Sequence, residues 1–128
     1  MLFRSAFIAD ARRWRKALGG GMRQSGVLAA AGLYAMENHV QRLAEDHENA
    51  EYLAAGLRDA GLKVAPPQTN VVYLEVDPQQ VEGLKGYLKN LGILASIAAR
   101  TRLMTHMDLP RGGIDAAVRA FREYPHWS

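Results

Sequence analysis

The chain has 128 residues, enough for one ordinary domain, and is 48% hydrophobic and 23% charged, the mix typical of globular proteins. It contains no cysteine, which excludes disulfides and thiolate metal sites. No stretch approaches the roughly 18 apolar residues that a membrane-spanning helix needs, and the N-terminus lacks a signal-peptide pattern. We therefore expect a cytoplasmic protein with no membrane partner.

Positive charge gathers at the start of the sequence. Residues 1–26 carry six of the sixteen Lys and Arg residues and only one of the thirteen Asp and Glu residues. Such a local field attracts an anion: phosphate, carboxylate or nucleic acid. A solvated basic helix is the commoner explanation of a charge run taken alone.

The first half of the sequence predicts helices. Residues 7–17 are good helix formers, and Gly19–Gly21 end this segment because glycine is costly in a helix. Residues 26–60 predict a long helix with Ser25 as N-cap and Gly61 as C-terminal stop, and Gly32 or residues 46–49 are places where it could kink. One predicted face recurs at three- and four-residue intervals: Met36, Val40, Leu43, His47, Ala50, Ala54 and Leu57.

The second half mixes strands and helices. Residues 70–76 alternate as a strand does, and Asp77–Gln80 read as an N-cap, a first-turn proline and a capping-box glutamine. The helix that follows, with Val81, Leu84, Leu88 and Leu91 on one face, ends near Gly92. Residues 93–97 and 102–106 predict two more strands. The last predicted helix has an inward-facing side that consists of Ile114, Ala117, Val118 and Phe121.

These elements predict an α+β fold in which long helices precede a small β-α-β-β-α layer with an antiparallel sheet. We divide the chain into three parts. Residues 1–25 form a basic connecting helix and glycine loop, 26–62 a long helical linker, and 63–128 a small C-terminal domain.

Few residues could carry chemistry. The four histidines lack metal-ligand spacing, so no metal site is expected, and Lys85 and Lys89 lie on the exposed face of a helix. Arg23 follows a glycine loop at a helix start, where backbone N–H groups favour anions, but the pattern matches no phosphate-loop motif. Arg102 lies on a strand, where it is either an edge residue or a buried binding group.

Three segments together resemble the low-specificity L-threonine aldolases: "RRWRKALGGGMRQSGVLAAAG" with the helix after it, "TNVVYLEV" and "RLMTHMDL". The resemblance runs from about residue 7 to about residue 124. These are pyridoxal-phosphate (PLP) enzymes of fold type I, and the second half of the chain resembles their C-terminal small domain.

The resemblance implies cleavage of L-threonine, L-allo-threonine and related β-hydroxy-α-amino acids to glycine and an aldehyde, with PLP as electron sink. It implies a homo-oligomer, a dimer of dimers, whose active sites are shared between subunits. Lys16 and Arg23 match positions near the cofactor phosphate and substrate, and Arg102 matches the residue that binds the substrate carboxylate.

Other active-site parts have no counterpart in the chain. The family's Schiff-base lysine lies before the matched region, and the "RWRK" context of Lys16 matches a different position. We therefore expect a C-terminal fragment that is inactive alone, with no catalytic residue of its own. Residues 1–5, "MLFRS", do not resemble the family, and we expect them to be an artefact at the start of a truncated reading frame.

Two other functions stay open. The basic N-terminal helix fits a stand-alone module that binds phosphate or nucleic acid, although the sequence holds no recognised nucleic-acid motif and we expect no nucleic-acid partner. The apolar face from Met36 to Leu57 fits a helical interaction domain that associates through this seam.

Overall fold

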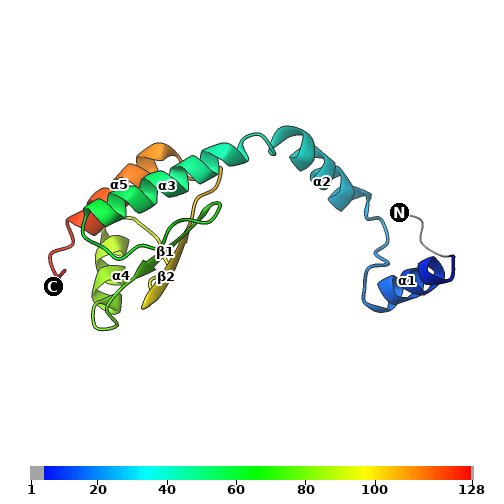
Figure 1. The fold of residues 1–128 in the computed structure, drawn as a ribbon, viewed down its shortest axis with the longest axis horizontal. Helices are drawn as coiled ribbons and strands as arrows, with labels where there is room; N and C mark the ends of the chain where they lie inside the picture. Colours follow the sequence, from blue (N-terminus) through cyan, green and yellow to red (C-terminus); the bar gives the residue numbers. More distant parts are fainter. Residues whose placement is uncertain (1–4, 128) are drawn as a thin grey trace. The chain divides into compact units, whose positions relative to one another are not determined.

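A computed structural model describes residues 5–127 and divides the chain into two compact units, residues 1–40 and 41–128. We call them the N-terminal unit and the C-terminal unit and describe each by itself (Figure 1). Residues 1–4, which hold most of the expected artefact, lie outside the described residues.

The N-terminal unit consists of two helices and a loop. Helix α1 spans Ser5–Ala17, which confirms the helix predicted at residues 7–17, and α2 spans Gly26–Asn38. None of the residues in either helix is buried. The end of α1 is closed by a bond from the Leu18 N–H to the Trp14 carbonyl and by Gly19, whose φ of 85° is left-handed. The side chain of Ser25 makes no capping bond, contrary to prediction.

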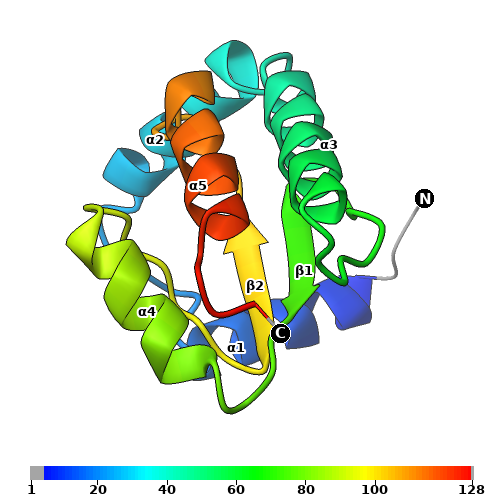
Figure 2. The ribbon, with the colours of Figure 1, turned by 90° about the vertical axis from the view of Figure 1, so that its left-hand side faces the viewer.

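The C-terminal unit packs three helices against two strands. Its elements are α3 (Leu43–Asp59), β1 (Val71–Glu75), α4 (Val81–Asn90), β2 (Arg100–Met104) and α5 (Arg111–Arg122). The strands are antiparallel, with Tyr73 opposite Arg102 and Glu75 opposite Arg100. Figures 1 and 2 show α3 and α5 side by side over one face of this sheet. The arrangement is a mixed α+β fold, as predicted.

The core lies between the helices and the sheet. Alternate residues of β1, Val72 and Leu74, are fully buried, as the alternating pattern predicted. The largest fully buried apolar side chains come from all three helices and β1: Leu57, Leu74, Leu84, Leu88, Ile114, Val72 and Phe121. The C-terminal tail adds Tyr124, whose ring centroid lies 5.3 Å from that of Tyr87 on α4.

The long helix predicted at residues 26–60 is two helices, and the break at residues 39–42 lies at neither predicted kink. The C-terminal stop at Gly61 is confirmed, with φ of 84°. The predicted apolar face is half right. Ala50, Ala54 and Leu57 are buried, whereas Met36, Val40, Leu43 and His47 are exposed.

Two strand predictions need correction. Residues 93–97 form no strand: Ile97 is buried and Ile93 is half-buried in the core, but the segment joins no ladder. The last strand spans Arg100–Met104, so it begins and ends two residues earlier than predicted. At its start the Thr101 hydroxyl closes a turn with both the N–H and the carbonyl of Ala98.

The structure also differs from the helix cap that was predicted at Asp77–Gln80. The Asp77 carboxylate accepts the N–H of Gln79 and so forms a turn, and the helix begins only at Val81.

Candidate functional site

Lys16 lies in the last turn of α1 and is exposed. Its Nζ donates a 3.3 Å hydrogen bond to the carbonyl of Gly21, so the side chain folds back over the glycine loop. The Lys16 side chain fits there because glycine has no side chain. A Cβ at Gly21 would overlap Lys16 Cδ, and one at Gly20 would lie 2.8 Å from Arg15 Cγ. The loop is therefore shaped around the side chains at the end of α1.

Arg23 follows the loop, two residues beyond Gly21. It is exposed, and no hydrogen bond or ion pair joins it to another described residue. Gln24, the next residue, has φ of 54°, and α2 begins at Gly26 without a side-chain cap. Arg23 thus precedes an uncapped helix start, a place where an anion is favoured over a cation.

Arg102 lies in the middle of β2, a strand paired on one side only in the described sheet. Its side chain is exposed on the face of the sheet opposite the helices. Arg100, two residues earlier on this face, places its guanidinium 4.7 Å from the ring centroid of Tyr73. Arg102 has no such contact within residues 5–127, which leaves its planar fork open to a carboxylate.

A groove runs beside Arg102. It has a volume of about 560 Å³, and its lining includes Arg100, Met104 and His106 with apolar residues of α5. His106 Nδ1 accepts the backbone N–H of Asp108 at 3.3 Å and lies 3.8 Å from the Asp108 carboxylate. The positive charge of Arg102 therefore lies at the edge of a largely apolar hollow.

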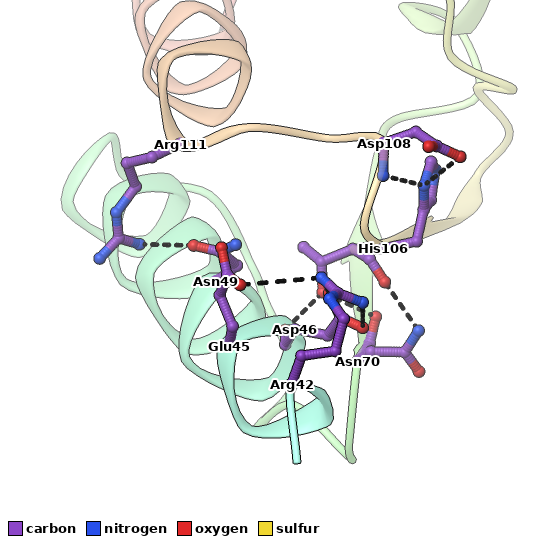
Figure 3. A network of polar contacts seen from close by, with 9 residues as sticks. Arg42, Glu45, Asp46, Asn49, Asn70, His106, Asp108 and Arg111 are labelled. Atoms are coloured by element: carbon purple, nitrogen blue, oxygen red, sulfur yellow. Dashed lines mark hydrogen bonds and ion pairs between the residues drawn. The ribbon is translucent and has the colours of Figure 1, made fainter. Parts of the chain in front are cut away.

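A buried polar network fixes the far end of β2 (Figure 3). The Thr105 hydroxyl donates to the carbonyl of Asp46 at 2.6 Å, and the Asn70 amide donates to the carbonyl of Thr105 at 2.8 Å. The Asp46 carboxylate in turn accepts two bonds from Arg42, at 3.0 and 3.1 Å. These contacts tie the first turn of α3 to the ends of both strands.

Sequence reasoning missed this network, although a signal was present. Asp46 stands four residues before Ala50 and four after Arg42, so it belongs to the buried stripe of α3 and can reach the arginine. A second contact of this kind joins Arg111, at the start of α5, to the Asn49 side chain at 3.1 Å (Figure 3).

The three predicted site residues share one chemical property. Lys16, Arg23 and Arg102 are exposed cations, and none forms an ion pair with a carboxylate of the described chain. Lys16 and Arg23 belong to the N-terminal unit, and Arg102 belongs to the C-terminal unit. Such groups can hold phosphate or carboxylate, and the contacts described give none of them an acid or base partner.

Residues 5–127 lack two kinds of feature. Between Ser5 and Trp127, no three His, Asp or Glu side chains gather as metal ligands would. The same part of the chain contains no helix with the length and apolar character needed to cross a bilayer.

Comparison with known proteins gives one consistent result. The chain is 47% identical over 118 residues to the low specificity L-threonine aldolase of Escherichia coli, a match that covers 92% of this chain and 35% of the relative. It is 35% identical over 128 residues to a probable low-specificity L-threonine aldolase 2 of Arabidopsis thaliana, covering 94% and 36%. The chain thus spans about a third of the length of these curated relatives. The family model of beta-eliminating lyases matches residues 1–79, and the chain belongs to that family.

Proposed function

We propose that this chain is the C-terminal part of a PLP-dependent aldolase that cleaves threonine, allo-threonine and related β-hydroxy-α-amino acids to glycine and an aldehyde. The observation that carries the proposal is the 47% identity to the Escherichia coli enzyme over 92% of the chain. We call the full-length enzyme that carries this chain the parent enzyme.

The residues of the N-terminal unit fit a phosphorylated cofactor. Lys16 and Arg23 are exposed cations on either side of a glycine loop, and such groups bind phosphate by charge and by hydrogen bonds. Bound PLP supplies the electron sink for breaking the bond between Cα and Cβ of the substrate. In this proposal Lys16 and Arg23 bind and orient anionic groups of the cofactor or substrate, and neither moves a proton.

Arg102 is proposed to hold the substrate carboxylate. Its guanidinium has no described partner, whereas the neighbouring Arg100 is held over the Tyr73 ring. A bidentate bond to the carboxylate would fix one end of the substrate while the other end reacts. Of the two arginines on this face of β2, Arg102 is therefore the better placed to bind a ligand.

The remaining machinery is proposed to lie in the part of the relatives that this chain does not match. That part would hold the Schiff-base lysine and most of the cofactor pocket, and a dimer of dimers would complete the sites. The C-terminal unit would then be the small domain of a fold-type I PLP enzyme.

The isolated chain tests the missing-lysine part of the proposal. Mixed with PLP, it should show no lysine-bound cofactor absorbance, no borohydride trapping at a single lysine and no cleavage of threonine. Stable modification of one lysine together with turnover would overturn the fragment assignment. Salt-sensitive DNA binding by the isolated chain would instead favour a nucleic-acid-binding module.

The parent enzyme tests the residue roles. Arg102→Ala should raise KM for threonine roughly 10- to 100-fold, because hydrogen bonds to charged groups are worth about 1.5–3 kcal/mol. Arg23→Ala should instead weaken retention of PLP. Arg119→Ala, an exposed α5 arginine, and Arg12→Ala, an exposed α1 arginine, are the matched controls and should change neither quantity. Wild-type KM and PLP affinity in both site variants would refute the assignments.

A further inference from the structure

We propose that Gly21 is a positioning residue for Lys16: its missing side chain lets the lysine lie across the glycine loop with the ammonium held at the loop backbone. The inference rests on the proposed function, since Lys16 matters only if it meets an anion. It extends that function by assigning a role to a glycine to which the proposed function gives none.

The contact is close along the whole end of the lysine side chain. A Cβ placed on Gly21 would overlap Lys16 Cδ and would lie 3.2 Å from Cε and 3.1 Å from Nζ. The Nζ also donates to the Gly21 carbonyl at 3.3 Å. The lysine stem therefore occupies the space that any other residue at position 21 would fill.

The three glycines of the loop serve different purposes. Gly19 has a left-handed φ of 85° and nothing within 4 Å of a Cβ position, so it is needed for backbone conformation. A Cβ at Gly20 would lie 3.0 Å from the Arg15 carbonyl, which is backbone and cannot easily move. Gly21 has no such φ, and only a flexible side chain stands in the way. An alanine at position 21 should thus leave the backbone in place and displace Lys16.

Holding Lys16 in this position should help it to bind an anion. An exposed lysine samples many rotamers. A ligand that fixes one of them binds less tightly, because ordering the side chain costs free energy. Contact with Gly21 restricts the ammonium to the loop that leads to Arg23, two residues further on. Within the described residues neither cation has a carboxylate partner, so both charges remain available to a phosphate.

A double-mutant cycle in the parent enzyme tests the proposal, with the dissociation constant of PLP and the kcat and KM for threonine as readouts. Lys16→Ala and Gly21→Ala should each weaken PLP binding, Gly21→Ala by roughly 2- to 10-fold, the cost of ordering one long side chain. The double variant should bind PLP no more weakly than Lys16→Ala alone. The control is Gly86→Ala, an exposed position in α4 with nothing within 4 Å of the new Cβ, and it should bind PLP as the wild type does.

A structural readout uses the 128-residue chain itself. Nuclear Overhauser contacts should join the Lys16 side chain to the backbone of residue 21 in the wild type and should vanish in Gly21→Ala, while the helical circular dichroism signal stays unchanged. This measurement reports the geometry whether or not the chain takes part in PLP chemistry.

The outcomes separate the two proposals. If Gly21→Ala and Lys16→Ala weaken PLP binding by independent factors, Gly21 acts through the fold and the positioning role is wrong. If Lys16→Ala weakens binding but Gly21→Ala does not, the positioning role is wrong and the function of Lys16 stands. If Lys16→Ala has no effect on PLP, both the role of Lys16 and this inference are overturned. A parent enzyme that binds no PLP refutes the proposed function, while loss of the Overhauser contacts in Gly21→Ala still supports the geometry.

Discussion

The two units of the chain differ in what holds their helices. In the C-terminal unit, α3 and α5 bury Leu57, Ile114 and Phe121 against the sheet. In the N-terminal unit, α2 is almost wholly apolar, yet none of residues 26–38 is buried. A helix that is apolar all round is normally covered by other protein, because its own propensity stabilises it little in water.

This difference affects how firmly each proposed anion-binding residue is held in position. Arg102 lies on a strand whose other face is a packed core, so its position follows from the fold of the C-terminal unit. Lys16 and Arg23 stand beside a loop between two helices that bury nothing of their own. We infer that the C-terminal unit holds Arg102 by its own core. In the N-terminal unit only the local contact with Gly21 orders Lys16, and Arg23 needs a covering surface before its position is fixed.

Hydrogen exchange on the isolated chain is the strongest test of this comparison. Amides in the centres of β1 and α3 should exchange on the order of 10³-fold more slowly than those of α1 and α2, because a helix without buried contacts opens at almost no cost in free energy. Mass spectrometry of peptides from each element measures the ratio. Equal protection of α2 and β1 would show that α2 already has a covering partner, such as a second copy of the chain.

Matched truncations in the two units should differ by several kcal/mol. Phe121→Ala removes a side chain that is 1% exposed and should lower the free energy of unfolding by about 3–5 kcal/mol. Leu28→Ala removes one that is 62% exposed on α2 and should change it by about 0.5 kcal/mol or less. Urea denaturation followed by circular dichroism compares them. A large loss in Leu28→Ala would contradict the absence of packing around residues 26–38.

The ion pair at the start of the C-terminal unit should have an intermediate effect. Arg42→Ala leaves the Asp46 carboxylate, which is 4% exposed, without its two charged donors, so we expect a loss of about 1–3 kcal/mol. Lys85→Ala is the control, since the Lys85–Glu82 pair spans 3.7 Å between exposed side chains and should be worth about 0.5 kcal/mol or less. Equal losses in urea denaturation would mean that water reaches Asp46 once Arg42 is gone.

The sequence predicted the elements whose signals are local. The helix at residues 7–17, the strand at residues 70–76 and the stop at Gly61 each depend on a few neighbouring residues, and all three are confirmed. The segment at residues 93–97 has strand-like composition. It forms no strand because pairing needs a neighbouring strand, and the described sheet contains only β1 and β2. The break at residues 39–42 was not predicted, because no glycine or proline marks it.

The candidate site also has features that the sequence predicts and features that it does not. From composition and spacing alone, Arg23 and Arg102 were only possible anion-binding residues. The resemblance to threonine aldolases gave them specific roles. The contact between Lys16 and Gly21 could not be read from the sequence, because "GGG" does not reveal which glycine is needed for φ and which for space. The Arg42–Asp46 pair could have been found from its four-residue spacing on the buried stripe.

The smallest expected effect concerns a surface contact between α3 and α5. Tyr52 donates a 2.7 Å hydrogen bond to the Asp115 carboxylate, and the Arg111 guanidinium lies 3.8 Å from the centroid of its ring. The hydrogen bond to Asp115 and the negative charge of Asp115 raise the pKa of Tyr52 above its ordinary value of 10.0, with Arg111 opposing them. The neutral phenol is therefore the form that the folded state favours.

The sign of the pH dependence follows from that shift. Because the folded-state pKa is raised, the contact contributes its full stability below about pH 10 and loses it as pH rises through the raised pKa. Asp115→Asn should move the ultraviolet titration of Tyr52 to lower pH, whereas Asp59→Asn, an exposed acid on the same helix as Tyr52, should not. Tyr52 is 44% exposed, so solvent screens the interaction and the effect on unfolding should be small beside that of Phe121→Ala. An unchanged titration in Asp115→Asn would mean that the hydrogen bond between Tyr52 and Asp115 does not form in solution.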